Sequence, residues 1–152
     1  MEKDKSIDVL NSLITINNDR IQGYETAIDE TDEIDLQTMF AKCIQTSQEC
    51  KAALVSEVTK LGGTPDDGTR IDGKIYRAWM DFKSLLTGKD RKAILSSCEY
   101  GEDVAVHTYE KAMKDEDAEL TPEHRTLVAE QYDKIKADHD KVREMRDALV
   151  DA

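Results

Sequence analysis

Histidines and carboxylates are the side chains of this sequence that could hold a metal ion or a proton. The chain has three histidines, His107, His124 and His139, and 33 Asp and Glu residues. In di-iron helical bundles, two helices each supply a Glu and two others each supply a Glu-x-x-His pair, because carboxylates and imidazoles suit iron or manganese. Here the residues three positions before the histidines are Val104, Thr121 and Lys136. The missing Glu-x-x-His pairs argue against an ordinary di-iron oxidase.

A smaller carboxylate–histidine site stays open, and its membership depends on how the helices are connected. A helix rises about 1.5 Å per residue, so counting from a turn compares heights on neighbouring helices. Glu99 and His139 each lie about 20 residues, or about 30 Å, from the turn between their helices, and Glu102 lies one turn deeper. If the connector crosses over, Glu25 joins this level; if it does not, Glu49 is the nearer carboxylate. These residues are candidate ligands for iron or manganese.

A purely structural interpretation of the same residues is the alternative. Carboxylates at the boundary of an apolar stripe usually face water or pair with a nearby Lys or Arg. His139 would then pair with Glu99 and hold no metal. Three polar residues lie on the core stripes themselves and are expected to be buried groups that fix the helix register: Asn17, Ser47 and Gln131. Three tyrosines are expected in the core or at its boundary with their hydroxyls reaching water: Tyr24, Tyr100 and Tyr109.

Four segments carry apolar residues at helical spacing. They predict helices over about 6–30, 33–61, 90–117 and 121–150. Gly62 and Gly63 follow the second segment and provide a stop, because glycine tolerates the left-handed conformation after a helix. Thr121 and Pro122 open the fourth segment as an N-cap followed by proline at the first helical position.

The connector between the second and third segments decides the topology. It begins as a turn-rich loop after Gly62 and then resumes helical spacing over about 74–87. A connector of this length fits the crossover of ferritin-like bundles, and the short joins near Thr31 and Leu120 make the helices on either side antiparallel neighbours. The sequence therefore predicts an all-α, ferritin-like four-helix bundle of two antiparallel helical hairpins, as a single domain over residues 1–152.

Composition and charge restrict the function classes. Aromatic residues make up only 5% of the chain, which is a poor supply for an all-β core. The formal net charge of −12 argues against binding to nucleic acids or to anionic membranes. Cys43, Cys50 and Cys98 match no zinc motif and are expected to be small reduced core residues. The N-terminus has no continuous apolar stretch of the kind a signal peptide needs, so the expected location is the cytoplasm.

Several stretches of the sequence resemble one family over nearly the whole chain and in the same order. They read LNSLITINNDRIQGYETA, LGGTPDDGT, YRAWMDFKSLLTGKD, EYGEDVAVHTYEKAM and QYDKIKADHDKVREMRD. These stretches resemble the PA2169-type four-helix-bundle family (DUF2383). The resemblance implies a ferritin-like bundle and says little about activity. One departure is Tyr76, which stands where the family tends to have a histidine before its Arg-x-Trp element.

Three hypotheses of function follow. The favoured one is a non-catalytic structural or interaction protein, for which a homo-oligomer is an open alternative by analogy with ferritin-like proteins. The second is a redox or storage-related protein that binds iron or manganese through Glu25, Glu99, Glu102 and His139. The third is a carrier of an apolar ligand, with a cavity around the small residues Gly101, Ala105 and Ala112. The sequence identifies no catalytic residue and names no substrate.

Overall fold

The computed structural model describes residues 2–66 and 91–150, and its regular structure there is entirely helical. Four long helices are α1 (Glu2–Glu30), α2 (Ile34–Lys60), α4 (Arg91–Lys114) and α5 (Pro122–Val150), and a short 3-10 helix η1 (Glu116–Ala118) precedes α5. The prediction of an all-α protein with four long helices is confirmed for these residues. The predicted short helix at about 74–87 lies outside them.

The helix ends follow local chemistry. Gly62 adopts a φ of 84° directly after α2, and the N–H of Gly63 donates to the carbonyl of Val58 at 3.0 Å, which satisfies a carbonyl at the helix end. The hydroxyl of Thr121 accepts from the N–H of His124 at 3.1 Å and caps α5. The third predicted helix ends earlier than expected, because Asp115 leaves the helix and its carboxylate accepts from the N–H of Asp117.

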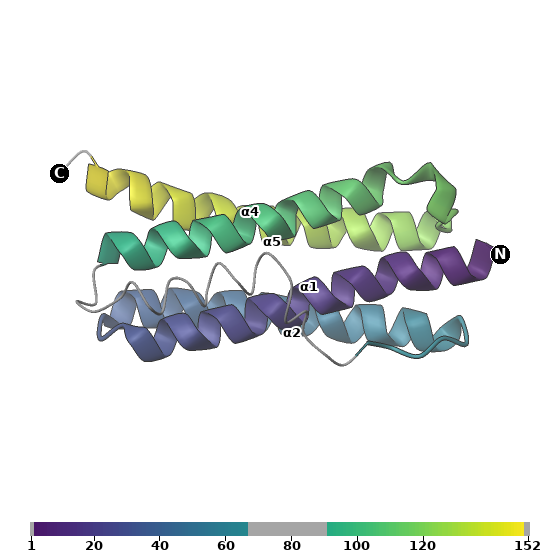
Figure 1. The fold of residues 1–152 in the computed structure, drawn as a ribbon, viewed down its shortest axis with the longest axis horizontal. Helices are drawn as coiled ribbons and strands as arrows, with labels where there is room; N and C mark the ends of the chain where they lie inside the picture. Colours follow the sequence, from purple (N-terminus) through teal and green to yellow (C-terminus); the bar gives the residue numbers. More distant parts are fainter. Residues whose placement is uncertain (1, 67–90, 151–152) are drawn as a thin grey trace.

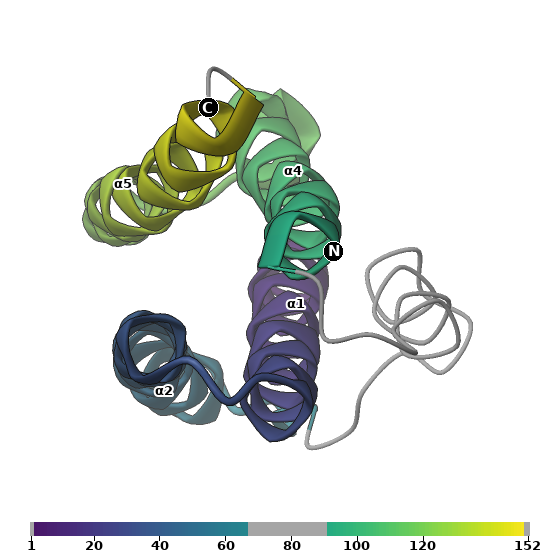
Figure 2. The ribbon, with the colours of Figure 1, turned by 90° about the vertical axis from the view of Figure 1, so that its left-hand side faces the viewer.

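Around the bundle, the helices follow one another in the order α2, α1, α4, α5 (Figure 2). Helix α1 therefore packs against α2 and α4, and α4 packs against α1 and α5. The α2–α5 pair has fewer contacts than the other neighbouring pairs. At one end, Arg91 at the start of α4 pairs with Asp35 at 2.9 Å and with Glu33 at 3.2 Å, beside the α1–α2 turn. Therefore α4 begins where α1 ends, as Figure 1 also shows.

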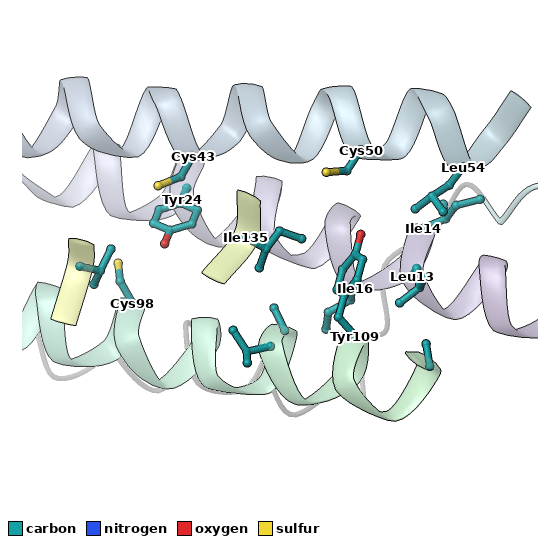
Figure 3. Packing of buried hydrophobic residues seen from close by; sticks show 14 of the residues in the cluster. Leu13, Ile14, Ile16, Tyr24, Cys43, Cys50, Leu54, Cys98, Tyr109 and Ile135 are labelled. Carbon is teal, nitrogen blue, oxygen red and sulfur yellow. The ribbon is translucent and has the colours of Figure 1, made fainter. Parts of the chain in front are cut away.

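The core is a stripe of apolar side chains from all four helices (Figure 3). Its largest members include Leu10, Leu13, Ile14, Phe40, Leu54 and Ile94. The three cysteines are free and buried, as predicted. Burial raises the pKa of Cys43 to about 12 and that of Cys50 to about 11, so both thiols stay protonated at neutral pH. Within the described ranges, no helix combines the length and the apolar character needed to cross a bilayer.

Candidate functional site

A buried ion pair between Arg20 of α1 and Glu102 of α4 lies at the centre of the bundle. Both side chains are 0% exposed. The Nε and Nη2 atoms of Arg20 each lie 2.7 Å from the same carboxylate oxygen, Oε1 of Glu102. Charge-assisted hydrogen bonds of this length are roughly twice as strong as those between neutral groups. The pair therefore fixes the facing positions of α1 and α4.

Side chains from the other helices complete the shell around the guanidinium. Nη1 of Arg20 donates to the hydroxyl of Ser47 in α2, and Nη2 donates to Oδ2 of Asp138 in α5 at 3.3 Å. The ring of Tyr24 lies beside the guanidinium, with 5.6 Å between Cζ and the ring centroid, and the Tyr24 hydroxyl donates to Oε1 of Glu102 at 2.8 Å. All four long helices thus contribute to one cluster, which we call the Arg20 cluster: Arg20, Tyr24, Ser47, Glu102 and Asp138.

The positions of these residues follow from the heptad-like spacing of the buried faces. In α1 the buried residues Leu13, Asn17, Arg20, Tyr24 and Ala27 follow one another at alternating steps of four and three. In α4 the same alternation connects Cys98, Glu102, Ala105, Tyr109 and Ala112. This spacing keeps one side of a helix facing its partners. Arg20 and Glu102 therefore occupy positions that an apolar residue would fill in an ordinary bundle.

Burial and charge act in opposite directions on both partners of this pair. The pKa of Glu102 is raised above its ordinary value by burial, and the charge and hydrogen bonds of Arg20 act in the opposite direction. Burial by itself lowers the pKa of Arg20, but Glu102 outweighs it, so the guanidinium pKa is well above its ordinary value. The second carboxylate oxygen of Glu102, Oε2, is buried and has no hydrogen-bond partner among the described residues. The carboxylate therefore has unused acceptor capacity.

A second buried polar layer lies toward the N-terminal half of α1 and centres on Tyr109 of α4. The Tyr109 hydroxyl accepts from Nδ2 of Asn17 at 2.8 Å and donates to Oε1 of Gln131 at 2.8 Å. Nε2 of Gln131 donates to the carbonyl of Cys50 at 3.1 Å. Four helices are joined again, and the predicted burial of Asn17, Ser47 and Gln131 is confirmed.

The prediction for the tyrosine hydroxyls is wrong for two of the three residues. Tyr24 and Tyr109 are fully buried, and their hydroxyls bond to protein groups instead of reaching water. Tyr100 is exposed. The buried hydroxyls satisfy polar partners on other helices, which is the usual requirement for a tyrosine inside a core.

The predicted metal ligands lie in different surroundings. Glu102 belongs to the Arg20 cluster, whereas Oε2 of Glu99 pairs with Nη1 of Arg146 at 2.7 Å. His139 does not pair with Glu99: its Nε2 lies 2.6 Å from Asp103 and its Nδ1 lies 2.9 Å from Asp140. Glu25 and Glu49 are exposed on α1 and α2.

A metal site at these residues stays a prediction. Within residues 2–66 and 91–150, no group of three or more His, Cys, Asp or Glu side chains is arranged to hold a metal ion. Three of the predicted ligands, Glu102, Glu99 and His139, instead lie in three different ion-pair groups, centred on Arg20, Arg146 and His139 itself.

Arg20 and Asp138 are the two residues of the Arg20 cluster that the sequence interpretation missed. The apolar neighbour of Arg20, Ile21, is only half-buried, while Arg20 is completely buried. The available signal was the spacing from Asn17 to Arg20 to Tyr24, which continues the heptad-like alternation through a charged residue. A polar residue in the middle of such a stripe points to a buried partner on another helix.

The fold and this site define the class of protein as an acidic helical bundle with a closed, ion-paired centre. The chain belongs to the family described as "Domain of unknown function (DUF2383)", whose model matches residues 5–115. The match includes α1, α2 and α4 and ends before α5. No curated protein matches the chain.

Proposed function

We propose that this chain is a non-catalytic structural or interaction protein built as a ferritin-like four-helix bundle. The observation that carries the proposal is the closed Arg20–Glu102 pair, in which both side chains are fully buried. A catalytic acid or base must come within hydrogen-bond reach of a reacting group. Glu102 is instead held by Arg20 and Tyr24 inside the core.

The remaining candidate residues support the same function. Glu99 is neutralised by Arg146, and His139 is held between Asp103 and Asp140. The Glu99–Arg146 and His139–Asp103 pairs join α4 to α5, and the His139–Asp140 pair lies within α5. We infer that these polar contacts fix the register of the helices, which is the best-attested role of buried polar groups in helical bundles.

The ferritin-like topology is part of the proposal. It rests on Arg91, whose ion pairs with Asp35 and Glu33 place the start of α4 beside the α1–α2 turn. In ferritin-like bundles one long crossover connection joins two hairpins in this way. Three free cysteines support a reducing compartment such as the cytoplasm, and a homo-oligomer is part of the proposal by analogy with ferritin-like proteins.

The metal content of the purified protein tests the proposed function. The untagged chain is expected to carry iron, manganese and zinc far below one ion per chain by elemental analysis, before and after incubation with each metal. His139→Ala is expected to leave these values unchanged, and His107→Ala on the exposed side of α4 is the matched control. Stoichiometric metal that is lost in His139→Ala alone would contradict the proposal.

Iron or manganese binding is the second candidate function, and one observation favours it. Oε2 of Glu102 is buried without a hydrogen-bond partner in the described part of the chain, while Glu99 lies one turn away and is also buried. A metal ion is one group that satisfies such an oxygen. In this case Glu102→Gln removes stoichiometric metal while the exposed Glu49→Gln does not.

A further inference from the structure

We propose that the centre of the bundle is a cation-binding site which the protein fills with its own Arg20 guanidinium. Three oxygen acceptors converge on this group from three other helices. They are Oε1 of Glu102 in α4, Oδ2 of Asp138 in α5 and the hydroxyl of Ser47 in α2. The cation therefore comes from α1, and the oxygen atoms that bind it come from the rest of the bundle.

The chemistry of the surrounding groups suits a planar cation. Carboxylates bind the forked N–H groups of a guanidinium with short charge-assisted hydrogen bonds. The Tyr24 ring, at 5.6 Å from Cζ of Arg20, adds the favourable contact between a cation and an aromatic face. Tyr24 is itself held by its hydroxyl on Glu102 and by packing at 5.4 Å between its ring centroid and that of Phe40. Tyr24 and Oε1 of Glu102 are thus held by contacts that do not involve Arg20.

Charge balance gives the second argument. Glu102 and Asp138 supply two carboxylates to the cluster, whereas Arg20 supplies one positive charge. Glu102 also keeps one buried carboxylate oxygen that no described group occupies. Without Arg20, the fully buried Glu102 and the part-buried Asp138 would lose the cation that both contact, and a cation from solution could replace it.

The inference goes beyond the proposed structural function and does not depend on it. The chemical class that the bundle centre accepts is the guanidinium cation. The Arg20 side chain is tethered to the site by its own helix, so a solution cation competes against an effectively permanent occupant.

Chemical rescue of Arg20→Ala tests the inference. The variant is titrated with guanidinium chloride at millimolar concentrations, and parallel titrations use urea, which is planar, similar in size and uncharged, and sodium chloride at matched ionic strength. Guanidinium is expected to raise the Tm of the variant saturably by about 3 °C or more, while urea and sodium chloride are not. Arg91→Ala, which removes a partly exposed arginine from a surface ion pair, is expected to show no saturable rise.

Two further measurements keep the result interpretable. If Arg20→Ala is unfolded in the absence of guanidinium, the same titration is followed by the helical signal in circular dichroism. Rescue then appears as recovered helix, since a ligand that binds the folded state shifts the folding equilibrium. Arg20→Met fills the space without charge and is expected not to respond to guanidinium. An equal effect of urea, an equal response of Arg20→Met, or no response of Arg20→Ala to guanidinium would each overturn the inference.

Discussion

His139 in α5 lies 2.6 Å from Asp103 in α4, measured from Nε2 to Oδ1. Its other ring nitrogen lies 2.9 Å from Asp140. Two carboxylates thus hold one imidazole that is only 8% exposed. Burial by itself lowers the pKa of His139, but the hydrogen bonds to Asp140 and Asp103 outweigh it, so the pKa is raised above its ordinary value.

The raised pKa predicts a pH dependence of stability. A histidine whose folded pKa exceeds its unfolded value stabilises the fold fully below the unfolded pKa of about 6.5, and this contribution disappears as the pH rises through the folded pKa. The free energy of unfolding is expected to fall by about 0.5–1 kcal/mol over this interval, because Asp103 is half-exposed and solvent screens the pair. Urea unfolding at a series of pH values measures it.

Two variants separate His139 from the other titrating groups. His139→Gln is expected to flatten the pH profile above pH 6.5, the ordinary pKa of histidine. His107→Gln serves as the control, since its side chain is 80% exposed, and the profile should keep the native shape. A His139→Gln profile identical to that of the native protein would mean that the imidazole contacts contribute nothing measurable.

The Arg20–Glu102 pair predicts strongly non-additive mutations. Removing one partner of a buried ion pair leaves an uncompensated charge and costs about 3–5 kcal/mol. Glu102→Leu and Arg20→Met are each expected to fall in this range. The double variant Arg20→Met/Glu102→Leu is expected to be less destabilised than either single variant, because both charges leave the core. Urea unfolding of the native protein, the two single variants and the double variant gives the coupling energy between the two side chains. Additive changes in the free energy of unfolding would show that the two groups are not coupled.

The hydroxyl of Tyr109 predicts a second stability effect. Tyr109→Phe removes the bridge between Asn17 and Gln131 and leaves two buried polar groups without this partner, at a cost of about 1–3 kcal/mol each. Tyr132→Phe is the matched control, since that hydroxyl bonds to Glu110 in a half-buried place, and it is expected to cost less than about 1 kcal/mol. Equal losses in the two variants would contradict a structural role for the Tyr109 layer.

The turn after α2 predicts a backbone effect. Gly62 has a φ of 84°, a conformation in which a Cβ atom is strained, so Gly62→Ala is expected to cost about 1 kcal/mol or more. Gly62→Asn should cost less, because asparagine tolerates the left-handed region. The difference is measured as a shift in Tm, with about 2–8 °C expected per kcal/mol. A variant Gly62→Ala as stable as Gly62→Asn would speak against the observed cap.

The sequence predicted the helices well because their signals are local. Apolar spacing, Gly62 and the Thr121 cap each act within a few residues, so the predicted bounds agree with the structure to within a few residues. The burial of Asn17, Ser47 and Gln131 followed from the same periodicity. A single sequence is therefore enough to predict which segments are helical and which side of each helix is apolar.

The site depended on information that spacing does not contain. Counting from the turns gives the height of a residue but not the side of the helix on which it lies, and Glu25 is exposed although its neighbour Tyr24 is completely buried. Arginine is almost never fully buried without a partner, so the residue type alone gives no reason to place Arg20 in the core. Its partners Glu102 and Asp138 are 82 and 118 residues away in the chain, and no local pattern connects them.

These long separations also set an order for folding. Asp138 belongs to α5, which is synthesised after α1, α2 and α4. The hydroxyl of Ser6 near the start of α1 reaches the carbonyl of Ala118, 112 residues later. Contacts of such large sequence separation slow folding, because the chain must close long loops before they form. A nascent chain therefore leaves Arg20, on the core-facing side of α1, without its partner Glu102 until α4 emerges, and Arg20 acquires its last partner, Asp138, only when α5 docks.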